Sequence, residues 1–171
     1  MAVRAFSRLR DKFPKVNFYV LGDEQDDDSK RVRAVMAECG AVNVRLLPFE
    51  RDKKKVLEWI RKALFLVVPS EFFENSPNTI LESFSCGRPV LATRLGCLPD
   101  MVKEHEYGLL YELGNTQDLS EKMEFLITHS EDRERMGKLA YEALRRDYGE
   151  SEHVDRLLNL FETTLHGKKA V

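Results

Sequence analysis

Residues 63–92, ALFLVVPSEFFENSPNTILESFSCGRPVLA, hold one strand–helix–strand pattern and decide the fold class. The run Ala63–Val68 is continuously apolar, which is typical of a strand buried on both faces of a parallel sheet. Apolar residues at helical spacing follow over Pro77–Cys86, and a second buried run follows at Pro89–Ala92. Strands that alternate with helices predict an α/β fold, with a parallel sheet and helices on both of its faces.

The same alternation extends in both directions along the chain. Before residue 63 we expect a helix over 2–13 stopped by Pro14, strands at 16–21 and 42–47, and helices from Asp26 to Gly40 and over 52–62. After residue 92 we expect a helix over 98–103, a strand at 108–111, and helices over 116–129, 131–147 and 150–165. Ligands of such sheets bind beyond the carboxyl ends of the strands, which points to the loops 22–28, 48–51, 69–77 and 93–98.

Composition excludes several classes of protein. The 171 residues suit about one domain, and 27 Lys and Arg against 29 Asp and Glu give a net charge of −2, which argues against a nucleic-acid binder. No apolar run approaches the roughly 18 residues of a membrane span, and no signal peptide is evident, so a cytoplasmic protein is expected. Three cysteines without a C-x-x-C pair suit free thiols, and no histidine stands at metal-ligand spacing, so we expect no metal.

Three common α/β chemistries lack their motifs. There is no G-x-G for a dinucleotide cofactor, no G-x-x-x-x-G-K-[ST] phosphate loop, and no G-x-S-x-G nucleophile elbow. With these chemistries excluded, the strongest remaining candidate for a functional site is the loop of residues 69–77, which runs directly into a helix.

This loop and the helix after it suit an anionic or polyhydroxylated ligand. Ser76 is predicted as the N-cap and Pro77 as the first helical residue. The free amides near Asn78, Thr79 and Ile80, at the positive end of the helix, then form a candidate phosphate or carboxylate site.

Two acids accompany these amides. Glu82 lies opposite the apolar face of the helix, between Asn78 and Ser85, and its carboxylate can accept hydrogen bonds from sugar hydroxyls. Glu74 comes eight positions earlier in the loop, so both acids could meet one ligand. On the residues alone, the alternative is a helix-capping acid and a solvated acid, since exposed Glu is common.

A series of short motifs spans Val68–Leu110 and resembles the C-terminal, donor-binding domain of the group 1 glycosyltransferases, enzymes of the two-domain GT-B architecture. The matching stretches, in order, are Pro69-Ser70, Glu74 and Glu82 as a pair separated by seven residues, Cys86–Val90, Ala92–Gly96 and Tyr107–Leu110. Any one of these motifs is weak evidence for the family, but five motifs in the right order are specific to it. The resemblance implies a Rossmann-like parallel sheet, the C-terminal half of a GT-B fold.

The resemblance also implies roles. Glu74 would contact hydroxyls of the donor sugar and Glu82 those of the nucleotide ribose. Sugar and diphosphate would be held by amides in the stretch that contains Asn75, Ser76, Asn78 and Thr79. The substrate is then a nucleoside-diphosphate sugar, transferred with retention of configuration, with no redox cofactor and generally no metal.

Two further loops would complete the donor site. Pro48 and Phe49 would pack beside the base, and the loop at Gly96 would approach the ligand closely. Here Cys97 replaces the second glycine of the family, and Asp100 its following glutamate.

The start of the chain departs from the family. A first strand with a Gly-Arg and a later Lys-Gly, whose Arg and Lys grip the diphosphate, would precede the first helix, yet the chain opens inside that helix at Ala2–Phe6. We therefore expect residues 1–171 to be one donor-binding domain, incomplete at its N-terminus and without the acceptor domain. The isolated chain is then expected to be inactive, or nearly so.

Two rival interpretations remain. The chain could be a non-catalytic relic, or a subunit that completes its sheet with a partner chain or a second copy, because unpaired strand edges invite pairing. The basic runs Arg51–Lys55 and Lys168-Lys169 could attract an anionic membrane surface, although a solvated helix start and tail explain them more simply.

Overall fold

The computed structural model describes residues 1–22 and 26–165. Its elements are α1 (Ala2–Ser7), β1 (Phe18–Leu21), α2 (Asp27–Cys39), β2 (Val44–Leu47), α3 (Lys53–Lys62), β3 (Leu66–Val68), α4 (Asn78–Ser85), β4 (Val90–Thr93), α5 (Leu98–Val102), β5 (Gly108–Tyr111), α6 (Thr116–Thr128), α7 (Ser130–Asp147) and α8 (Glu150–Leu165). Every strand and helix expected from the sequence is present, most of them shorter by a few residues.

The strands are parallel, and they divide into two sheets. β1 pairs with β2 in one sheet, from Phe18 opposite Val44 to Leu21 opposite Leu47. The other sheet has the order β3-β4-β5. The predicted α/β class is thus confirmed, but within the described residues no strand joins the two sheets.

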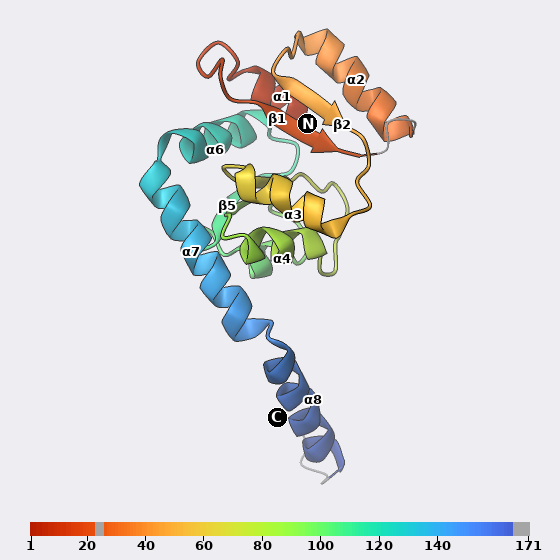
Figure 1. Ribbon diagram of the computed structural model, residues 1–171, viewed down its shortest axis with the longest axis vertical. Coiled ribbons are helices and arrows are strands. Elements are labelled where there is room, and N and C mark those ends of the chain that lie inside the picture. Colours follow the sequence, from red (N-terminus) through yellow and green to blue (C-terminus); the bar gives the residue numbers. More distant parts are fainter. Residues whose placement is uncertain (23–25, 166–171) are drawn as a thin grey trace.

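A shared core holds the two sheets together. One cluster of buried side chains combines Phe6 of α1 and Val44 of β2 with Leu91 of β4, Leu109 of β5 and Met123 of α6. A second cluster, which includes Ile80, Phe84, Val90, Val102 and Ala140, fills the space between the three-stranded sheet and α4, α5 and α7. Helices therefore cover both sides of the sheets (Figure 1).

The first helix is shorter than predicted. The expected helix over 2–13 ends at Ser7, and the chain continues in turns in which Leu9 N–H bonds to Phe6 O and Phe13 N–H to Leu9 O. These turns still direct Leu9 and Phe13 into the first core cluster, and this explains why their spacing looked helical.

The last helix leaves the body of the molecule. α8 continues beyond the end of α7 and extends away from the sheets (Figure 1). It exposes Val154, Leu157, Leu158, Leu160 and Phe161. In the part of the chain that the structure describes, no helix is both long and apolar enough to cross a membrane.

Candidate functional site

The loop of residues 69–77 carries the chain from the carboxyl end of β3 into α4. Pro77 is extended at ψ 116° and is itself the N-cap, and its carbonyl accepts a hydrogen bond from Ile80 N at 3.1 Å. The predicted Ser76 cap is therefore wrong, because the helix begins one residue later, at Asn78, without a side-chain cap. No described group accepts a hydrogen bond from the N–H of Asn78 or Thr79, so both amides are open to a ligand.

Glu74 lies against the loop that follows β4. Its Oε1 accepts a hydrogen bond from Ser70 Oγ at 3.0 Å. Gly96 has a left-handed backbone, with φ 57°, and a Cβ there would lie 3.5 Å from both N and O of Glu74. The structure thus brings Glu74 and Gly96 together, although they are 22 positions apart in the sequence.

Cys97 lies in the same neighbourhood. Burial raises the pKa of the Cys97 thiol, and the carboxylates of Glu74 and Asp100 raise it further. Cys97 is therefore a neutral thiol beside the candidate site at neutral pH.

Glu82 lies in a groove between α3 and α4. The groove has a volume of about 320 Å³ and is lined by Lys53, Leu57, Asn78, Leu81, Glu82 and Ser85. The side chain of Glu82 is only 13% exposed, and its carboxylate forms an ion pair with Lys53 Nζ. Asn78 and Ser85 thus share a wall of the groove with Glu82.

The remaining candidate residues are more dispersed. Asn75 and Ser76 are exposed on the loop, and Pro48 and Phe49 are exposed beyond β2. No hydrogen bond or ion pair between described residues links Glu74 to Glu82. The two acids belong to different local groups, one facing the Gly96 loop and the other facing α3. Part of the predicted loop 22–28 lies outside the described residues.

Sequence reasoning missed two features of this region. Phe72 and Phe73 are 81% and 82% exposed beside Glu74, and an adjacent aromatic pair between two acids was visible in the sequence. Lys53 was assigned only to a charged run. Its pairing with Glu82, 29 positions away, depends on how α3 packs against α4, which no local pattern reports.

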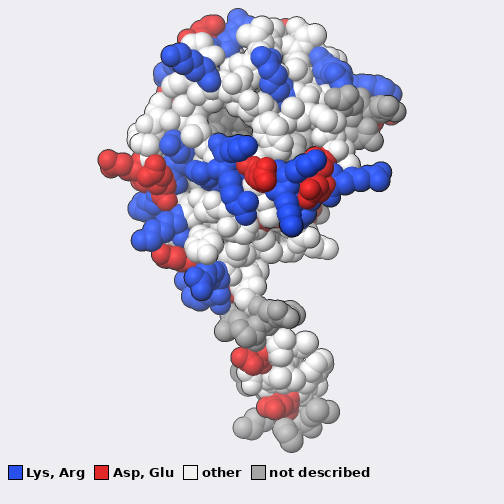
Figure 2. Space-filling model, viewed as in Figure 1, with Lys and Arg blue, Asp and Glu red and all other residues white. Residues whose placement is uncertain are grey.

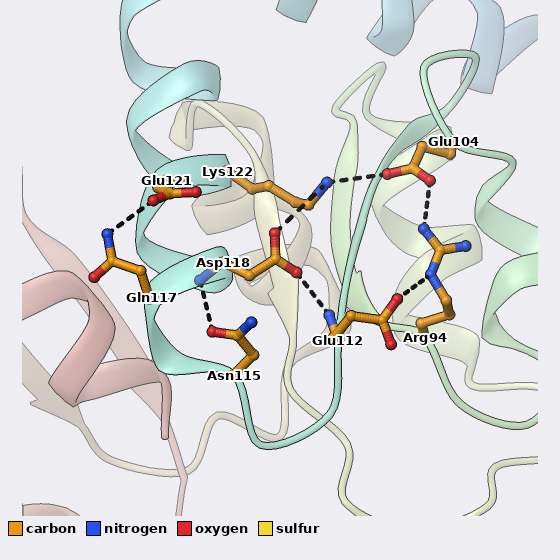
Figure 3. Close-up of polar contacts among 8 residues, drawn as sticks. All are labelled: Arg94, Glu104, Glu112, Asn115, Gln117, Asp118, Glu121 and Lys122. Carbon is orange, nitrogen blue, oxygen red and sulfur yellow. Dashed lines mark hydrogen bonds and ion pairs between the residues drawn. The ribbon is translucent and has the colours of Figure 1, made fainter.

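A polar network fixes the base of the Gly96 loop (Figure 3). Arg94, just after β4, donates to Glu112 Oε1 at 2.8 Å and to Glu104 Oε2 at 2.5 Å, and Lys122 of α6 donates to Glu104 Oε1 at 3.1 Å. Burial by itself would raise the pKa of Glu104, but the hydrogen bonds from Arg94 and Lys122 lower it below its ordinary value of 4.5.

The same network reaches the start of α6. Asp118 accepts a hydrogen bond from Glu112 N at 2.8 Å, and Asn115 caps α6 by accepting from Asp118 N at 3.0 Å. These hydrogen bonds connect the ends of β4 and β5 to α6. They restrain the base of the Gly96 loop, which lies against Glu74.

Metal-ligating side chains do not converge here. Within residues 1–22 and 26–165, no three His, Cys, Asp or Glu side chains come together in a group that could hold a metal ion.

The parallel strands with helices on both sides define a Rossmann-like α/β protein. The open amides of α4, the two acids and the Gly96 loop lie beyond the carboxyl ends of its strands, where proteins of this class bind their ligands, and form the candidate site. The sequence model of the family described as glycosyl transferases group 1 matches residues 1–143, and the chain belongs to this family.

Individual relatives carry glycosyltransferase names. An uncharacterised glycosyltransferase of Methanocaldococcus jannaschii is 34% identical over 122 residues, which cover 71% of this chain and 34% of the relative. A D-inositol 3-phosphate glycosyltransferase of Paenarthrobacter aurescens is 34% identical over 140 residues, covering 81% of this chain and 34% of the relative. The chain thus spans about a third of the length of these two relatives.

Solved structures share the fold. HepE of Anabaena, in complex with UDP, superposes with a TM-score of 0.83 at 19% identity over 95% of this chain and 44% of HepE. The C-terminal domain of a group 1 glycosyl transferase from Francisella tularensis superposes with a TM-score of 0.75 at 22% identity, over 85% of this chain and 76% of that domain.

Proposed function

We propose that this chain is the donor-binding domain of a retaining glycosyltransferase and that it binds a nucleoside-diphosphate sugar. The observation that carries the proposal is the arrangement around the start of α4, where two open amides stand with Glu82 in the groove beside them and Glu74 in the preceding loop. The binding of UDP by a structural neighbour supports it.

Each group has a role that suits its chemistry. Glu74 accepts hydrogen bonds from hydroxyls of the donor sugar, and Glu82 from hydroxyls of the ribose. The amides of Asn78 and Thr79, at the positive end of α4, donate to the diphosphate, and the exposed loop residues Asn75 and Ser76 lie beside it. Pro48 and Phe49 form an exposed platform for the base.

The reaction breaks the bond between the sugar and the diphosphate and forms a bond from the same anomeric face to an acceptor hydroxyl, which loses its proton. The open amides of α4 stabilise the negative charge that develops on the leaving diphosphate. The acceptor is a glycan, a lipid or a small molecule. It would be held by a further domain of a longer protein, so the chain alone is expected to bind donor without turning it over.

Calorimetric titration with UDP, GDP and ADP tests the proposal. One of them is expected to bind, and Glu74→Gln and Glu82→Gln each lose affinity for the matching nucleotide sugar. For the sugar-free nucleotide, Glu82→Gln has the larger effect. Glu71→Gln, an exposed acid on the same loop, is the matched control. Equal effects of all three substitutions would contradict the assigned roles.

The divided sheet favours a second candidate function, a subunit that completes its fold by association. β1 and β3 each leave one edge without a strand partner among the described residues, and such edges accept further strands. A partner chain or a second copy would then pair there. Light scattering of the purified chain, together with the nucleotide titration, distinguishes the two candidate functions. A monomer that binds nucleotide favours the donor-binding domain, and a stable dimer without nucleotide affinity favours the subunit.

Contact with a membrane surface has less support. Two cations of the Arg51–Lys55 run are already paired, Lys53 with Glu82 and Lys55 with Glu50. Lys168 and Lys169 lie outside the described residues. The free thiols of Cys39, Cys86 and Cys97 suit the reducing cytoplasm, where we place the protein.

A further inference from the structure

The start of α3 supplies a cation to the candidate donor site. α3 carries five basic residues in ten, and Figure 2 shows basic side chains, with acidic ones between them, in a belt across the face where α3 and α4 lie. Lys53 is the first residue of α3, and its ammonium contacts the carboxylate of Glu82 in the neighbouring helix. Lys55, two positions later, pairs instead with Glu50 at 3.6 Å, away from the groove.

The pair is asymmetric. The side chain of Lys53 is 63% exposed, whereas that of Glu82 is 13% exposed. A carboxylate with so little access to water is costly to keep charged unless a cation compensates it, while the lysine keeps most of its hydration. The contact with Lys53 therefore restrains the Glu82 carboxylate in one place on the wall of the groove.

The pairing leaves room for a ligand. A carboxylate has two oxygens with about four acceptor positions, and Lys53 occupies a position on Oε1. Glu82 lines the groove together with the polar Asn78 and Ser85. Two adjacent hydroxyls need two acceptor positions at a fixed distance and angle from each other. A carboxylate that Lys53 already holds in place provides them, and its side chain loses little further entropy when the ligand binds.

We propose that Lys53 is a positioning residue, which fixes Glu82 for the vicinal hydroxyls of a nucleotide ribose and so sets the preference of the site for ribonucleotides over 2′,3′-dideoxynucleotides. This inference rests on the proposed function, because that function assigns Glu82 to the ribose. It goes further by assigning a role to a lysine from another helix.

The test compares affinities for two ligands in the wild type and five variants. The ligands are whichever of UDP, GDP and ADP the wild type binds most tightly, and the 2′,3′-dideoxy form of that nucleotide, each titrated by NMR. The proteins are the wild type, Lys53→Met, Lys53→Arg, Lys54→Met, Glu82→Gln, and the double variant that combines Lys53→Met with Glu82→Gln. Lys54 is the matched control, because it is exposed on the same turn, carries the same charge and forms no ion pair with a described residue.

Lys53→Met is expected to weaken ribonucleotide binding about fivefold and to leave dideoxynucleotide binding within about twofold, so the ratio of the two affinities falls. Lys54→Met changes neither, and Lys53→Arg recovers most of the loss. Glu82→Gln lowers the same ratio, and adding Lys53→Met to it has little further effect, because the lysine acts through that carboxylate.

Three results would overturn this inference and leave the proposed function standing. They are an equal loss of affinity for both ligands in Lys53→Met, the same affinity changes in Lys53→Met and Lys54→Met, or additive effects of Lys53→Met and Glu82→Gln on ribonucleotide affinity. Lys53→Gln serves as a second neutral variant if Lys53→Met does not fold. If the wild type binds none of the three nucleotides, the proposed function fails, and this inference falls with it.

Discussion

The two sheets of the molecule are built differently. In the three-stranded sheet, all four residues of β4 and all four of β5 are buried. In the two-stranded sheet, β1 alternates between half-buried and exposed residues, and only Val44 of β2 is fully buried. Glu74, Gly96 and the start of α4 all follow strands of the three-stranded sheet. The candidate site thus rests mainly on the more deeply packed sheet, and Lys53 comes from α3, the helix between β2 and β3 that packs against α4.

The largest difference in the free energy of unfolding is expected when a glycine of each sheet is replaced by alanine. A Cβ on Gly108 would lie 1.8 Å from Val90 O, whereas one on Gly22, just after β1, would meet Ser29 Oγ at an ordinary 3.8 Å. Gly108→Ala is expected to lower the free energy of unfolding by more than about 3 kcal/mol, because backbone must move in a buried sheet. Gly22→Ala should change it by less than about 0.5 kcal/mol. Urea denaturation measures both, and similar values would show that the sheets are equally tolerant.

Truncation of apolar side chains is the second way to compare the sheets. Leu91 of β4 is fully buried, and Leu91→Ala is expected to cost about 3 kcal/mol of unfolding free energy. Val20 of β1 is exposed in part, and Val20→Ala should cost about 1 kcal/mol. Thermal unfolding followed by circular dichroism provides the comparison. A larger loss of stability in Val20→Ala than in Leu91→Ala would contradict the assignment of the three-stranded sheet as the more deeply packed one.

The network around Glu104 gives a smaller, pH-dependent effect. Since the folded-state pKa of Glu104 lies below its ordinary value, its ion pairs stabilise the protein above that value, and the stabilisation is lost as the pH falls through the folded-state pKa. Glu104→Gln is expected to cost about 1 kcal/mol at pH 7 and to match the wild type in acid, below that pKa.

A matched control is Glu38→Gln at the other sheet. Glu38 joins α2 to Arg4 of α1 on the exposed surface, where removal of an ion pair has little effect. Unfolding measured across a pH series would contradict the role of Glu104 if Glu104→Gln behaved like Glu38→Gln at every pH.

Local chemistry made much of the fold readable from the sequence. Continuous apolar runs marked the buried strands, and Gly40, left-handed at φ 56°, ended α2 where expected. The failures occurred where another interaction competed with a local rule. After Ser7 the chain forms turns that place Leu9 and Phe13 at the spacing expected of a helix. At the start of α4, Pro77 is the N-cap in place of Ser76, and its carbonyl accepts the hydrogen bond from Ile80 N.

The candidate site was readable only in part, for a similar reason. Glu74, Glu82 and the helix amides lie in one short segment with a known order of motifs. Lys53 comes from a different helix and meets Glu82 only through tertiary packing. Likewise, the contact of Gly96 with Glu74 depends on how two strand ends lie side by side.

The location of a bound nucleoside diphosphate is the most direct test of the donor site. Amide chemical shifts of the labelled chain, followed during titration with UDP, GDP or ADP, are expected to move at residues 74–76, at Asn78 and Thr79, at Gly96 and at Glu82. Shifts centred instead on the cleft of about 260 Å³ lined by Arg88, Arg133 and Lys138, or the absence of shifts with all three nucleotides, would contradict a donor site at the start of α4.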